Sequence, residues 1–175
     1  MSVGRRLARL LVVLVAFAVS GVLAGVVWHA LWTPPSGVYY HDEWVIDAAG
    51  APQDVGGTAL YVVVGLVAGL VVGFAVTLTS RRDEMLVLAA VAVGSGVAGA
   101  LMAITGHALG PPDPRPLAAG QKDFTAADAD LRVEGTSPYV AYPAGALSAA
   151  TASFLLLNGP RRRDPENRFE AEPDE

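Results

Sequence analysis

Four long apolar segments, none of which contains Asp, Glu, Lys or Arg, restrict the folds open to this chain more than any other feature. They cover residues 10–31, 60–78, 85–104 and 140–157. A helix that crosses a membrane needs about 20 predominantly apolar residues, with a range of about 17–25. All four segments reach that length, so the sequence predicts an all-α membrane protein with a four-helix transmembrane bundle.

Composition narrows the possible functions. The 175-residue chain is 53% hydrophobic, carries a net charge of −5 and contains no cysteine. The absence of cysteine excludes disulfides, thiolate metal ligands and thiol chemistry. The acidic balance argues against nucleic acid as a partner, and the sequence contains no phosphate-binding loop or catalytic motif. We expect the lipid bilayer as a partner, no cofactor and no catalytic residue.

The distribution of Lys and Arg predicts the orientation. Three arginines lie in 1–9, two in 79–84 and four in 158–175, whereas the two outer loops, 32–59 and 105–139, share three basic residues. Because Lys and Arg concentrate on the cytoplasmic side, we expect a multi-pass protein of the cytoplasmic (plasma) membrane. Both termini would lie in the cytoplasm, as an even number of spans requires, and the charged C-terminal tail is predicted to be disordered.

The first span has an alternative interpretation as a secretory signal peptide, since positive charges precede it. Its apolar run is longer than the usual core of about 7–15 residues, and no convincing A-x-A cleavage site follows. We therefore expect a retained anchor.

Small residues recur at every fourth position of the spans, and this spacing places them on one side of a helix. Such faces let two membrane helices approach closely. They either hold one bundle together, which we favour, or join two copies of the chain, for which the second span is the best candidate. The short link over 79–84 predicts that the second and third spans are antiparallel neighbours. The predicted packing glycines are Gly21, Gly25, Gly65, Gly69, Gly73, Gly96 (between Ala92 and Ala100) and Gly145.

The outer loops predict a small cap of irregular or partly β structure. Residues 38–46 are rich in aromatic and β-branched side chains and predict one short strand. The stretch 48–57 predicts turns, because it is rich in Gly and contains Pro. In the second loop, Thr125 is placed to cap a short helix, whereas 131–133 favours a strand.

Two interpretations fit the polar and aromatic residues near the outer ends of the spans. Imidazole and carboxylate groups bind divalent cations, but their spacing here matches no known metal loop. The weak metal candidates are His41, Asp42, Glu43 and His107. The interpretation that we favour is an aromatic belt at the membrane surface, where amphipathic rings concentrate. Its predicted members are Trp28, Trp32, Tyr39, Tyr40, Trp44, Tyr61, Tyr139 and Tyr142.

The four spans share a combination of features with a known family of membrane proteins, which the chain resembles. The first span ends in "GVVWHALWTPPSGV", the second has a glycine stripe, the third is rich in Ala and Gly, and the fourth begins near "SPYVAYPAGAL". With the proline- and aspartate-bearing loop, this pattern resembles a family of small four-span actinobacterial membrane proteins of unknown function. The resemblance covers most of residues 5–157 and implies the same topology. It transfers no catalytic residue, because the family has no established activity.

Our leading hypothesis is a non-enzymatic accessory or scaffolding subunit of a cell-envelope complex, since the spans carry small-residue faces for helix packing and the sequence contains no catalytic motif. Its partner would be an envelope protein or a second copy of the chain. Two alternatives stay open. One is a component that binds or transports a cation or small ligand at the outer cap. The other, which we favour less, is an enzyme that acts on envelope lipid or cell wall with outer carboxylates as acid and base.

Overall fold

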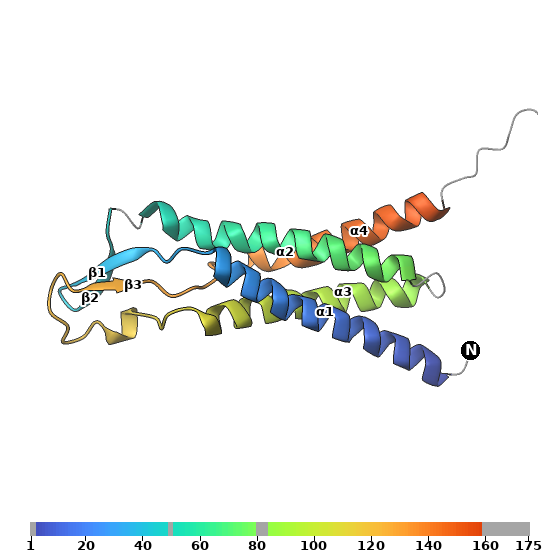
Figure 1. The fold of residues 1–175 in the computed structure, drawn as a ribbon, viewed down its shortest axis with the longest axis horizontal. Coiled ribbons are helices and arrows are strands. Elements are labelled where there is room, and N and C mark those ends of the chain that lie inside the picture. Colours follow the sequence, from blue (N-terminus) through green and yellow to red (C-terminus); the bar gives the residue numbers. More distant parts are fainter. Residues whose placement is uncertain (1–2, 49–50, 80–83, 159–175) are drawn as a thin grey trace, which may run out of the picture.

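The computed structural model describes residues 3–48, 51–79 and 84–158, which form four long helices with a small β-sheet at one end (Figure 1). The predicted four-helix architecture and partly β cap are thereby confirmed. By length and composition, each helix is able to cross a membrane. The predicted disordered tail beyond Asn158 and the two arginines of the link lie outside the described residues. The helices are α1 (Val3–Leu31), α2 (Ala51–Thr79), α3 (Glu84–Leu109) and α4 (Ala141–Asn158).

Helix α2 extends well beyond its predicted span at the end that carries the sheet. It begins at Ala51, so most of the stretch 48–57, predicted as turns, is helical. Pro52 is compatible with this, because a proline in the first turn of a helix gives up no intrahelical hydrogen bond. At Gly57 the missing side chain leaves room for Trp32, whose Nε1 lies 3.1 Å from where a Cβ would be. Packing against the Trp32 ring therefore explains why residue 57 is a glycine, although the sequence suggested that it belonged to a turn.

The helices pack mainly as two parallel pairs, α1 with α3 and α2 with α4. Both pairs are built on the same kind of contact, since a Cβ at Gly21 would meet the backbone of Ala98 and a Cβ at Gly73 would meet the backbone of Ala146. The bundle thus consists of two helix–loop–helix halves, α1–α2 and α3–α4, set side by side. Helices α2 and α3 run in opposite directions, but they make few contacts with each other. The predicted antiparallel arrangement is therefore confirmed, but each of these helices packs more extensively on its parallel partner than on the other.

Glycines bring the paired backbones together. A Cβ at five of the predicted positions would lie within 3.0 Å of backbone atoms on the facing helix, so only glycine permits the approach. Gly65 is looser, because the nearest atom, Met102 Sδ, would be 3.6 Å away. The glycine face of α2 is covered by α4 and is not free to join two copies of the chain. The five close positions are Gly21, Gly25, Gly69, Gly73 and Gly145.

The stripe predicted on the third span does not pack within the bundle. A Cβ at Gly96 would have no heavy atom within 4 Å, and Ala92 and Ala100 are exposed on the same face. Helix α3 meets α1 through Gly94 and Ala98 instead. Small residues occur on several faces of α3, so four-residue spacing alone did not identify the face that packs. The assignment of Gly96 to helix packing is therefore wrong for this bundle.

Four rings of the predicted aromatic belt are buried instead, Tyr39 in the cap sheet (6% exposed) and three rings of the helices. Trp28, Tyr61 and Tyr142 are each 0% exposed, and the Trp28 and Tyr61 rings meet edge to face at 5.1 Å. Trp28 Nε1 donates a hydrogen bond of 2.8 Å to the Gly57 carbonyl, and Tyr61 Oη donates one of 2.8 Å to the Gly99 carbonyl. The belt prediction is wrong for all four rings. Facing glycines leave room for the helix rings, and backbone carbonyls satisfy the polar atoms of Trp28 and Tyr61.

The cap contains a β-hairpin where the sequence predicted one strand over 38–46. Its strands are β1 (Ser36–Tyr40) and β2 (Glu43–Ile46), which pair antiparallel. The chain reverses at His41 and Asp42, whose φ values are 51° and 62°. Positive φ at both central residues is the conformation of tight two-residue hairpin turns, usually supplied by Asn or Gly. His–Asp is a weak signal for such a turn, so the reversal was missed.

The third strand, β3 (Ala126–Asp128), pairs antiparallel with β1, which gives the sheet order β2–β1–β3. The short helix expected after Thr125 does not form, because this stretch bonds to β1. Residues 131–133 do not form the alternative strand either; Leu131 is 1% exposed and packs into the hydrophobic core. The cap is therefore built from segments far apart in the chain, which local patterns do not pair.

Replacing Gly69 by Ala tests the approach of α2 to α4. The added Cβ would contact the Tyr142 backbone, which does not move aside as a flexible side chain does. We expect a loss of about 1–3 kcal/mol in the free energy of unfolding. Gly96→Ala is the matched control, since its methyl group meets open space, and should leave stability unchanged or raise it by up to about 1 kcal/mol, the advantage of Ala over Gly inside a helix. Unfolding of both variants in the same detergent measures the difference, and equal effects would contradict this helix pairing.

Candidate functional site

The cap joins the bundle through residues 129–134, just before α4. Leu131 belongs to the same hydrophobic core as the helices. Its carbonyl accepts a 2.9 Å hydrogen bond from Nδ1 of His107 near the end of α3. The backbone N–H of Glu134 donates to Oγ1 of Thr58 on α2 at 3.1 Å. Cap and bundle therefore form one packed unit.

An ion pair with a buried carboxylate and a partly exposed guanidinium, that of Arg115 (38% exposed), lies beside this junction. The side chain of Asp130 is 4% exposed, and Nη1 of Arg115 lies 3.3 Å from its Oδ1. The same guanidinium is 3.4 Å from Oδ1 of Asp113 and lies over the Trp44 ring, 5.3 Å from the ring centre. A carboxylate out of water is costly unless a cation and hydrogen bonds compensate it. Arg115 therefore holds two loop carboxylates and the β2 strand in one arrangement.

The Trp44 side chain lies on the face of the sheet that also carries Gly37 and Tyr39, which we call the inner face. Its Nε1 donates a 3.0 Å hydrogen bond to the Ala127 carbonyl. Its ring lies against Gly37, where a Cβ would come within 2.5 Å of ring carbons. Gly37 and Tyr39 of β1 are buried. The inner face of the sheet is thus closed by its own side chains and by Arg115.

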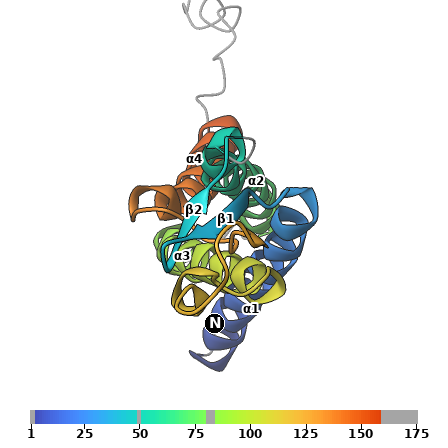
Figure 2. The same cartoon turned by 90° about the vertical axis from the view of Figure 1, so that its left-hand side faces the viewer.

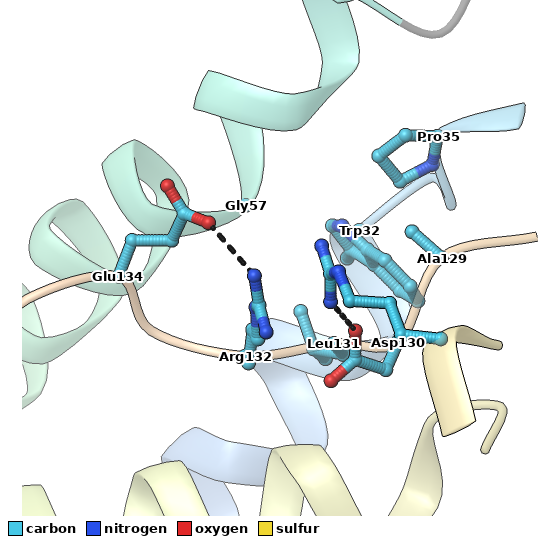
Figure 3. A pocket seen from close by; sticks show the side chains of 9 residues that line it. Trp32, Pro35, Gly57, Ala129, Asp130, Leu131, Arg132 and Glu134 are labelled. Atoms are coloured by element: carbon cyan, nitrogen blue, oxygen red, sulfur yellow. Dashed lines mark hydrogen bonds and ion pairs between the residues drawn. The ribbon is translucent and has the colours of Figure 1, made fainter. Parts of the chain in front are cut away.

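A small cavity lies between the cap and the helix ends (Figure 3). Trp32 at the end of α1, Gly57 of α2 and the junction residues Arg132 and Glu134 line it. Arg132 Nη2 is 3.2 Å from Glu134 Oε1, so these two charges are paired. Asp130, which also lines the cavity, is paired with Arg115. The volume of about 20 Å³ is close to the roughly 10–15 Å³ that one water molecule requires. This cavity therefore fits a water molecule and is too small for a substrate.

The structure places three of the four weak metal candidates at the tip of the hairpin and the fourth, His107, apart from them. His41 and Asp42 form the hairpin turn, Glu43 begins β2, and His107 lies near the end of α3. Oδ1 of Asp42 accepts a 2.9 Å hydrogen bond from the backbone N–H of Gly120. Among the described residues, no group of three His, Cys, Asp or Glu side chains is arranged to hold a metal ion. In this arrangement, Asp42 and His107 serve local hydrogen bonds that shape the cap.

The sequence interpretation missed the pair formed by Arg115 and Asp130. A signal was present, because Arg115 is one of three basic residues in the outer loops and stands between prolines in "PPDPRP". Prolines fix the backbone around such a side chain and make its position definite. Its partner lies 15 positions away across irregular structure, where no helical or strand period predicts contact. The local sequence could therefore have pointed to Arg115, but it could not have named Asp130 as its partner.

Comparisons with known proteins do not assign this chain to a family. No protein-family model, no curated protein and no solved structure matches the chain. The resemblance to four-span actinobacterial membrane proteins stays a prediction, and the function is argued below from the chain's own contacts.

Arg115→Ala should loosen the cap, because the buried Asp130 carboxylate loses its cation. Arg115 itself is 38% exposed, so we expect the cost of leaving this carboxylate without its partner, about 1–3 kcal/mol, and not the larger cost of opening a fully buried pair. Arg132→Ala is the matched control, since Arg132 and Glu134 are 41% and 57% exposed and such pairs contribute about 0–1 kcal/mol. Hydrogen exchange of residues 126–134 measures the loosening. Equal protection in both variants would show that Arg115 does not hold the cap.

Proposed function

We propose that the protein spans the cytoplasmic membrane four times, with the cap outside and both termini in the cytoplasm. The outward faces of the helices carry large apolar side chains, such as Val12 (68% exposed), Val63 (58%) and Leu155 (69%). Soluble proteins rarely leave such extended apolar surface in water, and lipid chains would cover it. In the sequence, Lys and Arg concentrate before the first helix, between the second and third, and after the fourth, and this distribution supports the orientation.

The helices serve as the anchor in this proposal. Ser20 of α1 and Tyr142 of α4 share a 2.7 Å hydrogen bond between their hydroxyl groups. Tyr61 of α2 bonds to the backbone of α3 at Gly99. These interior polar groups link neighbouring helices, which is the usual role of hydroxyls between membrane helices.

The protein then acts as a non-enzymatic accessory or scaffolding subunit of a cell-envelope complex, and the cap is its contact surface. The observation that carries this proposal is the attachment of the cap to the bundle through Leu131 and through the buried Asp130 carboxylate, which pairs with Arg115. A surface held in one arrangement loses less conformational freedom on binding than a mobile loop does. Such attachment suits a surface that must be presented to a partner at a fixed height above the membrane.

Photo-crosslinking in living cells tests this function. A photo-reactive residue is placed at Tyr40 on the sheet, at Leu117 on the adjoining loop, or at Val63 on the outward face of α2; all three are exposed. We expect one or both cap positions to capture the same envelope protein reproducibly, because the cap is the contact surface. Val63 is the control and should capture lipid. If both cap positions give only lipid, self-crosslinks or no product, the scaffolding function is wrong.

A further inference from the structure

One face of the cap sheet is uncovered and combines apolar with acidic side chains. Directly paired residues of neighbouring strands point to the same face of a sheet. The register pairs Tyr40 with Glu43, Val38 with both Val45 and Ala126, and Ser36 with Asp128. We call this set the outer face. It consists of Ser36, Val38, Tyr40, Glu43, Val45, Ala126 and Asp128.

The outer face leaves large side chains open to solvent. Tyr40 is 43% exposed and Val45 is 45% exposed, whereas Gly37 and Tyr39 on the inner face are buried. The sheet lies beyond the ends of α1 and α3 (Figures 1 and 2), so the bilayer that surrounds the helices would not cover it. Its apolar residues are therefore open to another molecule in the aqueous space.

Phe124 extends this surface at the tip of the hairpin. Its side chain is 74% exposed, and its ring centre lies 5.5 Å from that of Tyr40. Phe124 has a φ of 65°, which is unfavourable for a bulky residue. Its N–H donates a 2.8 Å hydrogen bond to the Tyr39 carbonyl, which holds it in place. The fold thus keeps an aromatic ring in solvent at a conformational cost, a combination found at binding surfaces.

The charges around these rings are mainly negative. Glu43 and Asp128 are exposed at opposite ends of the outer face. At the tip, Asp123 Oδ1 accepts a 3.1 Å hydrogen bond from the His41 N–H, which places a further carboxylate next to the rings. Aromatic faces attract cations, and carboxylates form charge-assisted hydrogen bonds with Arg and Lys. The outer face therefore offers both groups that recognise a basic side chain.

From this complementarity we infer that the outer face binds a basic segment of another protein, one in which Arg or Lys alternates with apolar residues. The inference rests on the proposed scaffolding function and names the chemistry of its partner. A second copy of the chain fits poorly, because the described cap, residues 33–48 and 110–140, carries eight acidic and three basic side chains. Two such caps would repel each other.

Peptide binding to the full chain tests the inference. The protein is placed in nanodiscs of zwitterionic lipid, and binding is measured for a six-residue peptide of alternating Arg and Phe, with empty nanodiscs as the blank. We expect saturable binding that weakens as salt rises, and no binding of the corresponding Glu–Phe peptide. The double variant Glu43→Gln/Asp128→Asn should weaken binding about tenfold, and Phe124→Ala should weaken it as well.

Glu134→Gln is the matched control, because it also converts an exposed carboxylate to an amide but lies at the junction with the helices. It should change the Kd less than twofold, and thermal unfolding shows that each variant is folded. The inference is overturned if binding is absent, if the acidic peptide binds equally, or if Glu134→Gln weakens binding as much as the double variant. Crosslinking in cells separates the two claims. Capture of an envelope protein that survives the double variant contradicts the inference but leaves the scaffolding function standing.

Discussion

Close approach of helix backbones at glycine is the constraint on which this structure depends. Lipid gives membrane helices no hydrophobic reason to associate, so van der Waals contact and interhelical hydrogen bonds must stabilise the bundle. Gly21 brings α1 onto α3, and Gly69 with Gly145 brings α2 onto α4. Once the backbones are this close, the Trp28 and Tyr61 rings fill the space between the pairs and bond to backbone carbonyls. Because the chain reverses direction from each helix to the next, both outer loops lie at one end of the bundle.

The sequence predicted the features that depend on neighbouring residues along the chain. It did not predict those that depend on contacts between distant segments. The four spans followed from apolar length, and five of the seven packing glycines meet a facing backbone. Gly96 was misassigned because spacing defines a stripe without saying which helix it faces. The Trp28 ring was placed at a membrane surface because its preference for interfaces is an average property, whereas here a glycine-lined space admits it. The hairpin turn at His41 and the contact of Arg115 with Asp130 depend on pairing across the cap, which no period in the sequence encodes.

The cap explains why a chain with so few ionisable groups in its helices carries many in its loops. Arg115 and Asp130 pair at the junction, where the loop before α4 enters the core at Leu131. Carboxylates farther out, such as Asp42, bond to backbone N–H groups and shape the tip. In the proposed role, the helices, the junction and the sheet each have a part. The helices fix the position in the membrane, the pair of Arg115 and Asp130 fixes the cap, and the outer face of the sheet meets a partner.

Cysteine accessibility tests most directly the central claim, a membrane-spanning bundle that presents the cap outside. The chain has no cysteine of its own, so a single one at Leu117 in the cap or at Thr79 at the opposite end of α2 reports on one side alone. Both positions are exposed. With a membrane-impermeant maleimide on spheroplasts, the account predicts that Leu117→Cys reacts at once and that Thr79→Cys reacts only after the membrane is permeabilised. Labelling of Thr79→Cys before Leu117→Cys, or equal labelling of both in intact spheroplasts, would contradict the account.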